Sequence, residues 1–234
     1  MVDGVALSAL DWWSEAGVDT LVDDLPRDWL APTPVAEPVR AAPPSSPSAP
    51  AAPTALPATL EAFRAFLLAD ATIPGPATLR IDAIGDPASG VAIVVDMPEA
   101  EDRASGRLLS GEVGALFDRM LGAIKLTREQ IYLIPFSPAR PTTGRLGAAE
   151  VKALAPLLVR HLTLAATKKL LLLGDAPVQA LLQRPAATAR EAVHLVSLGG
   201  TEIPAVASIH PRLVHLKREW RPLAWADLQR FAAL

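Results

Sequence analysis

Short apolar runs alternate with segments of helical periodicity along residues 58–234. Four of these runs are almost wholly apolar, and they lie at 90–95, 131–134, 169–173 and 203–209. Continuous apolar runs of this length are typical of parallel strands buried on both faces. Apolar residues recur at helical spacing over 112–124, 148–164, 177–182 and 220–233, and Thr59 is placed to cap a further helix. The alternation predicts an α/β fold of three αβα layers, with a four-stranded, mainly parallel sheet at the centre.

The first 57 residues follow a different pattern. Residues 31–57 hold nine of the 23 prolines, mixed with alanine, serine and threonine, which predicts an extended, disordered linker. Residues 1–30 form a short acidic element with three tryptophans and with apolar residues at helical spacing. This element is expected either to dock on a protein partner or to fold back over the chain's own core. The main domain is therefore predicted to cover residues 58–234.

The composition narrows the class of protein. Half of the residues are hydrophobic and 20% are charged, which excludes a fully disordered chain. No apolar run approaches the ~18 residues that a membrane-spanning helix needs, and we expect a soluble, cytoplasmic protein without membrane contact. The chain has no cysteine, which excludes disulfides and thiolate-ligated metals. His161 and His194 have no partner at metal-ligand spacing, so no metal site is expected, and no cofactor is expected either.

Charge is divided unevenly along the chain. Residues 1–30 carry seven acidic residues against one arginine, whereas residues 58–234 carry 17 acidic and 20 basic residues. A mildly basic domain is compatible with a polyanionic partner but does not by itself identify one.

Candidate chemistry gathers where the predicted strands end. In a parallel sheet, ligands bind at the carboxyl ends of the strands, and three polar segments fall there: 96–102, 135–140 and 210–212. Together they supply carboxylates, a histidine and arginines, which suit acid–base, electrostatic or phosphate-binding chemistry. The same residue types also serve as helix caps and solvated loops, so composition alone leaves the role open.

The order and spacing of several motifs are more specific. The chain has GRLLSG at 106–111 followed by GALFDRML at 114–121, then Tyr132 through RP at 140–141, PLLVR at 156–160, LG at 173–174, IHP at 209–211 and WADL at 225–228. In this order the motifs resemble the uracil-DNA glycosylase superfamily, and most closely its bacterial and archaeal family 4 enzymes. The resemblance covers residues 60–234.

The resemblance implies base excision from single- or double-stranded DNA by a bacterial, monomeric repair enzyme. Such enzymes flip uracil out of the helix and hydrolyse its N-glycosidic bond. Carried over to this sequence, His210 would stabilise the departing base and Asp96 would position water. The residues that correspond to the base pocket are Met97, Pro98, Leu109, Pro135, Phe136 and Ser137. Those that correspond to contacts with the DNA backbone are Arg140, Arg145, Arg212, Lys217 and Arg218.

The sequence departs from the family pattern at several functional positions. VDMPE at 95–99 stands in place of the family's GEAPG, so both glycines are lost. Leu109 replaces an aromatic residue, and Pro135 replaces an asparagine that reads the base. The cysteines of the family's iron–sulfur cluster correspond to positions near Ala71, Ala139 and Leu154. Only the His210–Pro211 motif is intact.

Two functions from different classes remain. The first is a diverged glycosylase linked to DNA repair, which hydrolyses the glycosidic bond of a flipped uracil. The second is a catalytically inactive module that binds DNA through its basic face, or a protein through residues 1–30. A nucleotide-binding α/β protein is a weaker third, because no glycine-rich phosphate loop follows any predicted strand.

Overall fold

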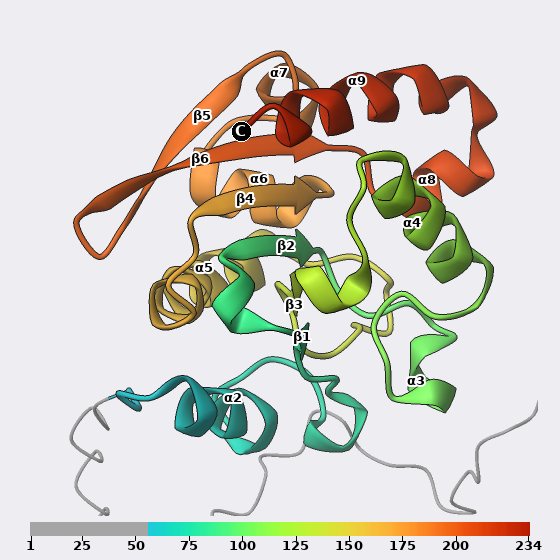
Figure 1. The fold of residues 1–234 in the computed structure, drawn as a ribbon. Helices are drawn as coiled ribbons and strands as arrows, with labels where there is room; N and C mark the ends of the chain where they lie inside the picture. Colours follow the sequence, from blue (N-terminus) through green and yellow to red (C-terminus); the bar gives the residue numbers. More distant parts are fainter. Residues whose placement is uncertain (1–55) are drawn as a thin grey trace, which may run out of the picture. The chain divides into compact units, whose positions relative to one another are not determined.

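The computed structural model describes residues 56–234, which belong to one compact unit, Thr54–Leu234 (Figure 1). The predictions for the acidic element at 1–30, and all but the last two residues of the linker at 31–57, lie outside the described residues. Within 56–234, no helix combines the length and apolar character needed to cross a bilayer.

A six-stranded sheet forms the centre, with the order β1-β3-β2-β4-β6-β5. The four predicted strands form its parallel middle: β3 (Tyr132–Pro135), β2 (Val91–Val95), β4 (Lys169–Leu173) and β6 (Thr201–Ser208). Two antiparallel edge strands were not predicted, namely β1 (Ile84–Gly85) and β5 (Val193–Leu198). The predicted four-stranded sheet is corrected to six strands, because β1 is only two residues long and β5 is largely exposed, so neither leaves a continuous apolar run.

Helices cover both faces of this sheet, which confirms the three predicted layers (Figure 1). The helices are α2 (Leu60–Ala69), α3 (Asp102–Ser105), α4 (Gly111–Ala123), α5 (Ala148–Leu164), α6 (Asp175–Leu182), α7 (Ala186–Ala189), α8 (Pro211–Leu216) and α9 (Arg221–Ala232). Residues 56–234 also contain four short 3-10 turns between these elements: η1 (Ala77–Leu79), η2 (Pro87–Ser89), η3 (Arg128–Gln130) and η4 (Arg218–Trp220).

Alternate residues of each parallel strand enter different cores. Val94 and Leu172 pack with α2, α5 and α6 on one face. Ile93 and Leu171 pack with α4, α8 and α9 on the other. Burial of such side chains contributes about 1.5–3 kcal/mol each. The two cores fix the central strands from both sides and thereby fix the positions of the loops at the strands' carboxyl ends.

Candidate functional site

The carboxyl ends of β2, β4 and β6 meet at one edge of the sheet and carry the predicted catalytic pair. Asp96 directly follows β2, and His210 follows β6 after one intervening residue. Strand β4 lies between them, so their backbones are roughly 10 Å apart. Asp96 lines a groove of about 1110 Å³ and His210 lines a neighbouring cavity of about 310 Å³. Gly174 and Leu213 belong to the walls of both hollows, so the two side chains face adjoining spaces.

The Asp96 carboxylate is held at the first turn of α6. Its Oδ1 atom accepts the backbone N–H of Ala176 at 2.9 Å. Gly174 makes this approach possible, because its φ is +111° and a Cβ there would clash with the carboxylate. Burial raises the pKa of Asp96 to about 7; the Ala176 hydrogen bond opposes this shift and the nearby charge of Asp175 adds to it. Asp96 therefore exists in both protonation states near neutral pH.

His210 is a buried, neutral hydrogen-bond donor. Its side chain is 1% exposed and caps α8, with Nδ1 accepting the backbone N–H of Arg212 at 3.2 Å. Burial lowers the pKa of His210 to about 3, and the charges of Arg212 and Arg140 lower it further. An imidazole that accepts through Nδ1 while neutral carries its proton on Nε2. His210 can therefore offer an N–H to a group that develops negative charge.

Glu99, an added carboxylate at a family glycine position that is expected to repel phosphate, is a site residue outside the predicted set. Its side chain is about 10% exposed, and Oε1 lies 3.6 Å from His210 Nδ1 and 3.7 Å from Arg212 Nε. Its other oxygen, Oε2, lies 3.6 Å from Arg140 Nη1. Burial raises the pKa of Glu99, while Arg212 and Arg140 act in the opposite direction. The sequence feature that could have identified Glu99 as a site residue is its charge directly after Pro98, in the loop that follows a buried strand.

Asp102 anchors the loop that carries Glu99, although no motif in the sequence points to it. Its fully buried carboxylate accepts backbone N–H groups from Glu99 at 2.8 Å, Leu109 at 2.9 Å and Ser110 at 2.6 Å. It also accepts the Ser110 hydroxyl at 2.6 Å. Four hydrogen bonds to one side chain close residues 99–110 into a fixed loop.

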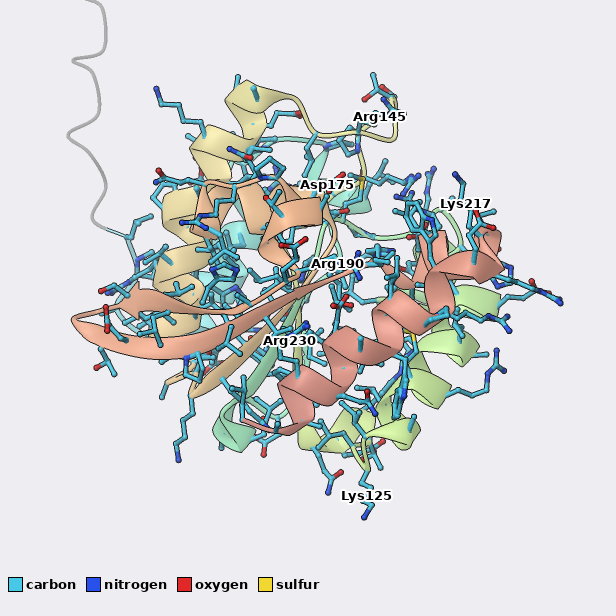
Figure 2. All side chains as sticks on the ribbon, turned by 90° about the horizontal axis from the view of Figure 1, so that it is seen from above. Lys125, Arg145, Asp175, Arg190, Lys217 and Arg230 are labelled. Carbon is cyan, nitrogen blue, oxygen red and sulfur yellow. The ribbon has the colours of Figure 1, made fainter. Side chains whose placement is uncertain are left out.

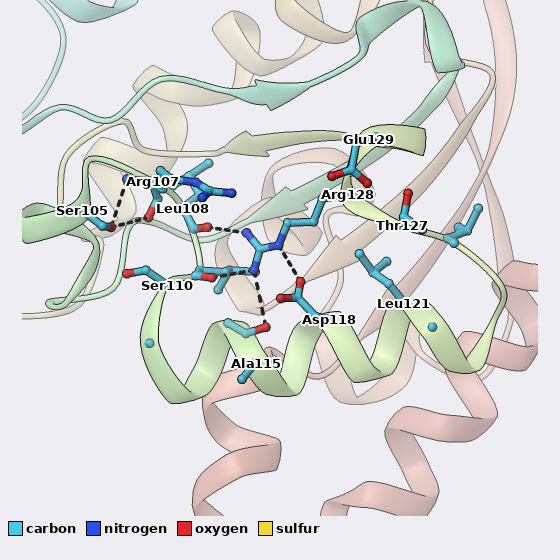
Figure 3. Close-up of a pocket in the computed structure, with 15 residues that line it drawn as sticks. Ser105, Arg107, Leu108, Ser110, Ala115, Asp118, Leu121, Thr127, Arg128 and Glu129 are labelled. Carbon is cyan, nitrogen blue, oxygen red and sulfur yellow. Dashed lines mark hydrogen bonds and ion pairs between the residues drawn. The ribbon is translucent and has the colours of Figure 1, made fainter.

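Arg128 also holds this loop (Figure 3). Its guanidinium donates to the carbonyl oxygens of Leu108 at 2.9 Å and Leu109 at 2.7 Å, and pairs with Asp118. These residues line a hollow of about 660 Å³ beside α4. The Arg128 guanidinium donates to carbonyl oxygens of the protein itself. We therefore assign the residues of this hollow to the support of the loop and not to ligand binding.

The six residues predicted to form a base pocket do not surround one hollow. All six are buried, but Met97 lines the groove beside Asp96, whereas Leu109 lines the hollow beside α4. Phe136 packs into the core on one face of the sheet and Leu109 into the core on the other. The hydroxyl of Ser137 donates to Ala139 O at 2.7 Å, so it is engaged within its own loop. Pro98 and Pro135 contribute no side-chain hydrogen-bonding group.

The five predicted backbone-binding residues divide into two groups. Arg140 and Arg212 are half-buried and face Glu99, and Arg140 also donates to Pro98 O at 3.2 Å. Arg145, Lys217 and Arg218 are exposed, and Arg145 lines the groove beside Asp96. Figure 2 shows Arg145 and Lys217 pointing outward. The exposed group is free to meet a polyanion, whereas Glu99 partly neutralises the other.

The residues at the family's cluster positions do not fit an iron–sulfur cluster. Ala139 and Leu154 are buried, Leu154 within the apolar core on one face of the sheet, and Ala71 is exposed. None of the three offers a thiolate, and the chain has no cysteine. Among the described residues, no three His, Asp or Glu side chains gather in an arrangement suited to a metal ion.

The layers and the strand-end site define an α/β protein with a carboxylate after β2 and a neutral imidazole donor after β6, on either side of β4. A family model described as the uracil DNA glycosylase superfamily matches residues 83–229, and the chain belongs to this superfamily. A comparison with curated proteins found no match.

Proposed function

We propose that the protein is a diverged DNA glycosylase that hydrolyses the N-glycosidic bond of a flipped uracil in DNA repair. The observation that carries the proposal is the state of His210, which is buried, neutral and protonated on Nε2. A donor held in this way suits a leaving base that departs as an anion.

Asp96 supplies the complementary half of the reaction. In its ionised form the carboxylate orients a water molecule and takes up one of its protons as the water oxygen bonds to the sugar carbon. The glycosidic electron pair leaves with the base, and the N–H of His210 stabilises that charge. Because the pKa of Asp96 is about 7, we expect the rate of base release to rise as pH increases through 7.

DNA would be held by the exposed cations near the strand ends. Arg145 flanks the groove, and Lys217 and Arg218 follow α8, which His210 caps. Contacts between cations and phosphates position a protein on the DNA backbone without reading the base sequence. Because such contacts release counterions, DNA binding would weaken as the salt concentration increases.

A specific observation favours the second candidate, a DNA-binding module without catalysis. The hydroxyl of Ser137 bonds its own loop, and Pro135 has no side chain able to read a base. A pocket that discriminates among bases needs polar partners for the base edge. If the Ser137 hydroxyl keeps its hydrogen bond to the loop, neither position can read a base. The protein would then bind DNA and leave the glycosidic bond intact.

Release of uracil from single- and double-stranded oligonucleotides separates the two candidates. We expect wild-type release to exceed that of His210→Ala by about 10²–10³-fold, the range for loss of one positioned donor. His215→Ala is the matched control, because His215 lies on α8, the helix that His210 caps, and is exposed. Wild-type release no greater than that of His210→Ala would defeat the proposed mechanism, and release at background by both, with retained DNA binding, would support the inactive module instead.

A further inference from the structure

Arg80 binds the end of α2 and the segment that follows it through five hydrogen bonds. The residue is half-buried and lies directly after η1. Its terminal nitrogens donate to five backbone carbonyls: Nη1 to Leu67 at 3.3 Å, Leu68 at 3.1 Å and Asp70 at 2.9 Å, and Nη2 to Ile73 at 2.8 Å and Gly75 at 2.9 Å. The Nε atom is buried and has no hydrogen-bond partner among residues 56–234, so the two terminal nitrogens make all of these contacts.

The five carbonyls belong to two separate pieces of backbone. Those that Nη1 binds lie at the C-terminal end of α2, where carbonyl groups lack partners within the helix and where a positive charge is favourable. The last turn of α2 contains no basic residue of its own. Those that Nη2 binds lie in the loop 73–75. A planar guanidinium reaches both groups at once, whereas the single nitrogen of a lysine cannot.

The segment that Arg80 binds packs against the loop that follows β3. The N–H of Ile81, the residue after Arg80, donates to Pro138 O at 2.8 Å. Gly75 has a φ of +84° and lies against Ala139 so closely that a Cβ on Gly75 would come within 2.7 Å of the Ala139 Cβ. The chain on both sides of η1 is therefore joined to this loop.

The loop that follows β3 borders the strand-end site. The N–H of Ser137 donates to Asp96 O at 3.0 Å, so the loop is bonded to the backbone of Asp96. At the end of the loop, Arg140 donates to Pro98 O at 3.2 Å and faces Glu99. A displacement of the loop would therefore change the surroundings of Asp96 and the position of Arg140.

The same segments carry the positions at which the resemblance places an iron–sulfur cluster. Ala71 lies in the segment that Arg80 binds, and Ala139 lies in the loop against it. Leu154, the third position, packs in the same apolar core as Ile73. The chain has no cysteine, so thiolate ligation cannot join these segments. Hydrogen bonds and apolar packing join them instead.

We propose that Arg80 takes the place of the family's structural cluster. It is a positioning residue that holds residues 67–75 against the loop 136–140 and thereby fixes the backbone beside Asp96 and Arg140. It acts through this loop, since its own donors bond residues 67–75. The proposal goes beyond the proposed hydrolysis, because it applies equally to an active glycosylase and to an inactive module.

Thermal unfolding and amide chemical shifts of the full-length protein test this role. We expect Arg80→Gln to lower the melting temperature by about 4–10 °C, because hydrogen bonds to a charged group are lost. We also expect it to shift the amide signals of Ile81, Ser137 and Arg140, whereas a residue that only caps α2 would leave the signals of Ser137 and Arg140 unchanged. Arg80→Lys keeps the charge but cannot bridge both groups of carbonyls, so it should shift the same signals and recover only part of the melting temperature.

Arg160→Gln is the matched control. Arg160 is another half-buried arginine that donates to a backbone carbonyl, Pro57 O at 3.1 Å, but it contacts neither the segment 67–75 nor the loop 136–140 through a hydrogen bond. Its replacement should leave the amide signals of Ser137 and Arg140 in place.

Three results would overturn the proposal. Signals that move only within residues 67–81 would reduce Arg80 to a cap of α2. A melting temperature and spectrum of Arg80→Lys equal to those of wild type would show that a positive charge suffices. The same shifts in Arg160→Gln would show that they report general destabilisation. If Arg80→Gln does not fold, Arg80→Lys provides the same comparison, and because no DNA is used, the outcome is independent of whether the protein cleaves glycosidic bonds.

Discussion

The Oε1 atom of Glu99 lies 3.6 Å from Nδ1 of His210, although both atoms are hydrogen-bond acceptors when the carboxylate is ionised and the imidazole is neutral. Two arginines make this approach tolerable: Arg140 and Arg212 lie 3.6 and 3.7 Å from the same carboxylate. Glu99 thus holds Arg140 and Arg212 beside the neutral imidazole of His210. Its negative charge competes with any other anion that these two arginines could bind.

Removal of the Glu99 charge should tighten DNA binding. In Glu99→Gln the side chain keeps its shape, while Arg140 and Arg212 lose a competing anion and can meet phosphate oxygens. We expect a several-fold lower Kd and a steeper dependence on salt, since each added phosphate contact steepens the slope by about 0.7–0.9. Fluorescence anisotropy with a labelled oligonucleotide at several salt concentrations measures both. Glu101→Gln, at an exposed neighbouring acid, is the control, and an unchanged Kd in Glu99→Gln would contradict the prediction.

Asp96 should make the protein less stable as pH rises. Its pKa is about 7 in the folded state against an ordinary value of 3.8, so between these values the folded state keeps a proton that the unfolded state has lost. The contribution of Asp96 protonation to the free energy of unfolding is therefore fully present below pH 3.8 and is lost as pH increases through 7. We expect a loss of about 2–3 kcal/mol between pH 5 and pH 8. Urea unfolding at both pH values should show this loss in wild type and a smaller one in Asp96→Asn; equal losses would refute it.

The sequence predicted the middle of the fold well, because burial on both faces leaves a continuous apolar run. β4 is one such run, and the predicted helix over 148–164 matches α5 (Ala148–Leu164). Edge strands leave a weaker signal, since one side of β5 faces solvent and its residues are largely exposed. The hairpin that pairs it with β6 turns at Gly199 and Gly200, both at positive φ.

The site was less predictable, because its contacts join residues that are distant in sequence. Glu99 meets Arg140 and Arg212, which follow other strands, and no local spacing encodes that meeting. A motif also does not determine which face of the sheet its side chains pack on. Leu109 and Phe136 were both predicted to line the base pocket, yet they pack into cores on opposite faces of the sheet.

Asp102 should be the most sensitive position in the loop that carries Glu99. Asp102→Ala leaves three backbone N–H groups and one hydroxyl without their acceptor in a buried setting. We expect the free energy of unfolding to fall by about 3–5 kcal/mol, within the range for a broken buried network. Urea denaturation provides the measurement. Asp118→Ala, at a half-exposed acid that pairs with Arg128, should cost about 1 kcal/mol, and a similar cost at both positions would argue against the anchoring role.

His161 should make the protein acid-labile through a cause unrelated to the strand-end site. Its buried Nε2 lies 2.9 Å from the hydroxyl of Tyr132, and burial lowers its pKa to about 4. The unfolded state takes up a proton near pH 6.5 that the folded state excludes until pH 4, so stability is present above pH 6.5 and is lost as pH falls through this window. Between pH 7 and pH 4.5 we expect a loss of about 2 kcal/mol from this residue. His161→Gln keeps a hydrogen-bonding partner for Tyr132 but does not titrate, so its urea midpoint should fall less between the two pH values than that of wild type. His215→Gln, on an exposed histidine, should behave as wild type does; if His161→Gln does so too, the acid lability has another source, of which the low pKa of His210 is the next to test.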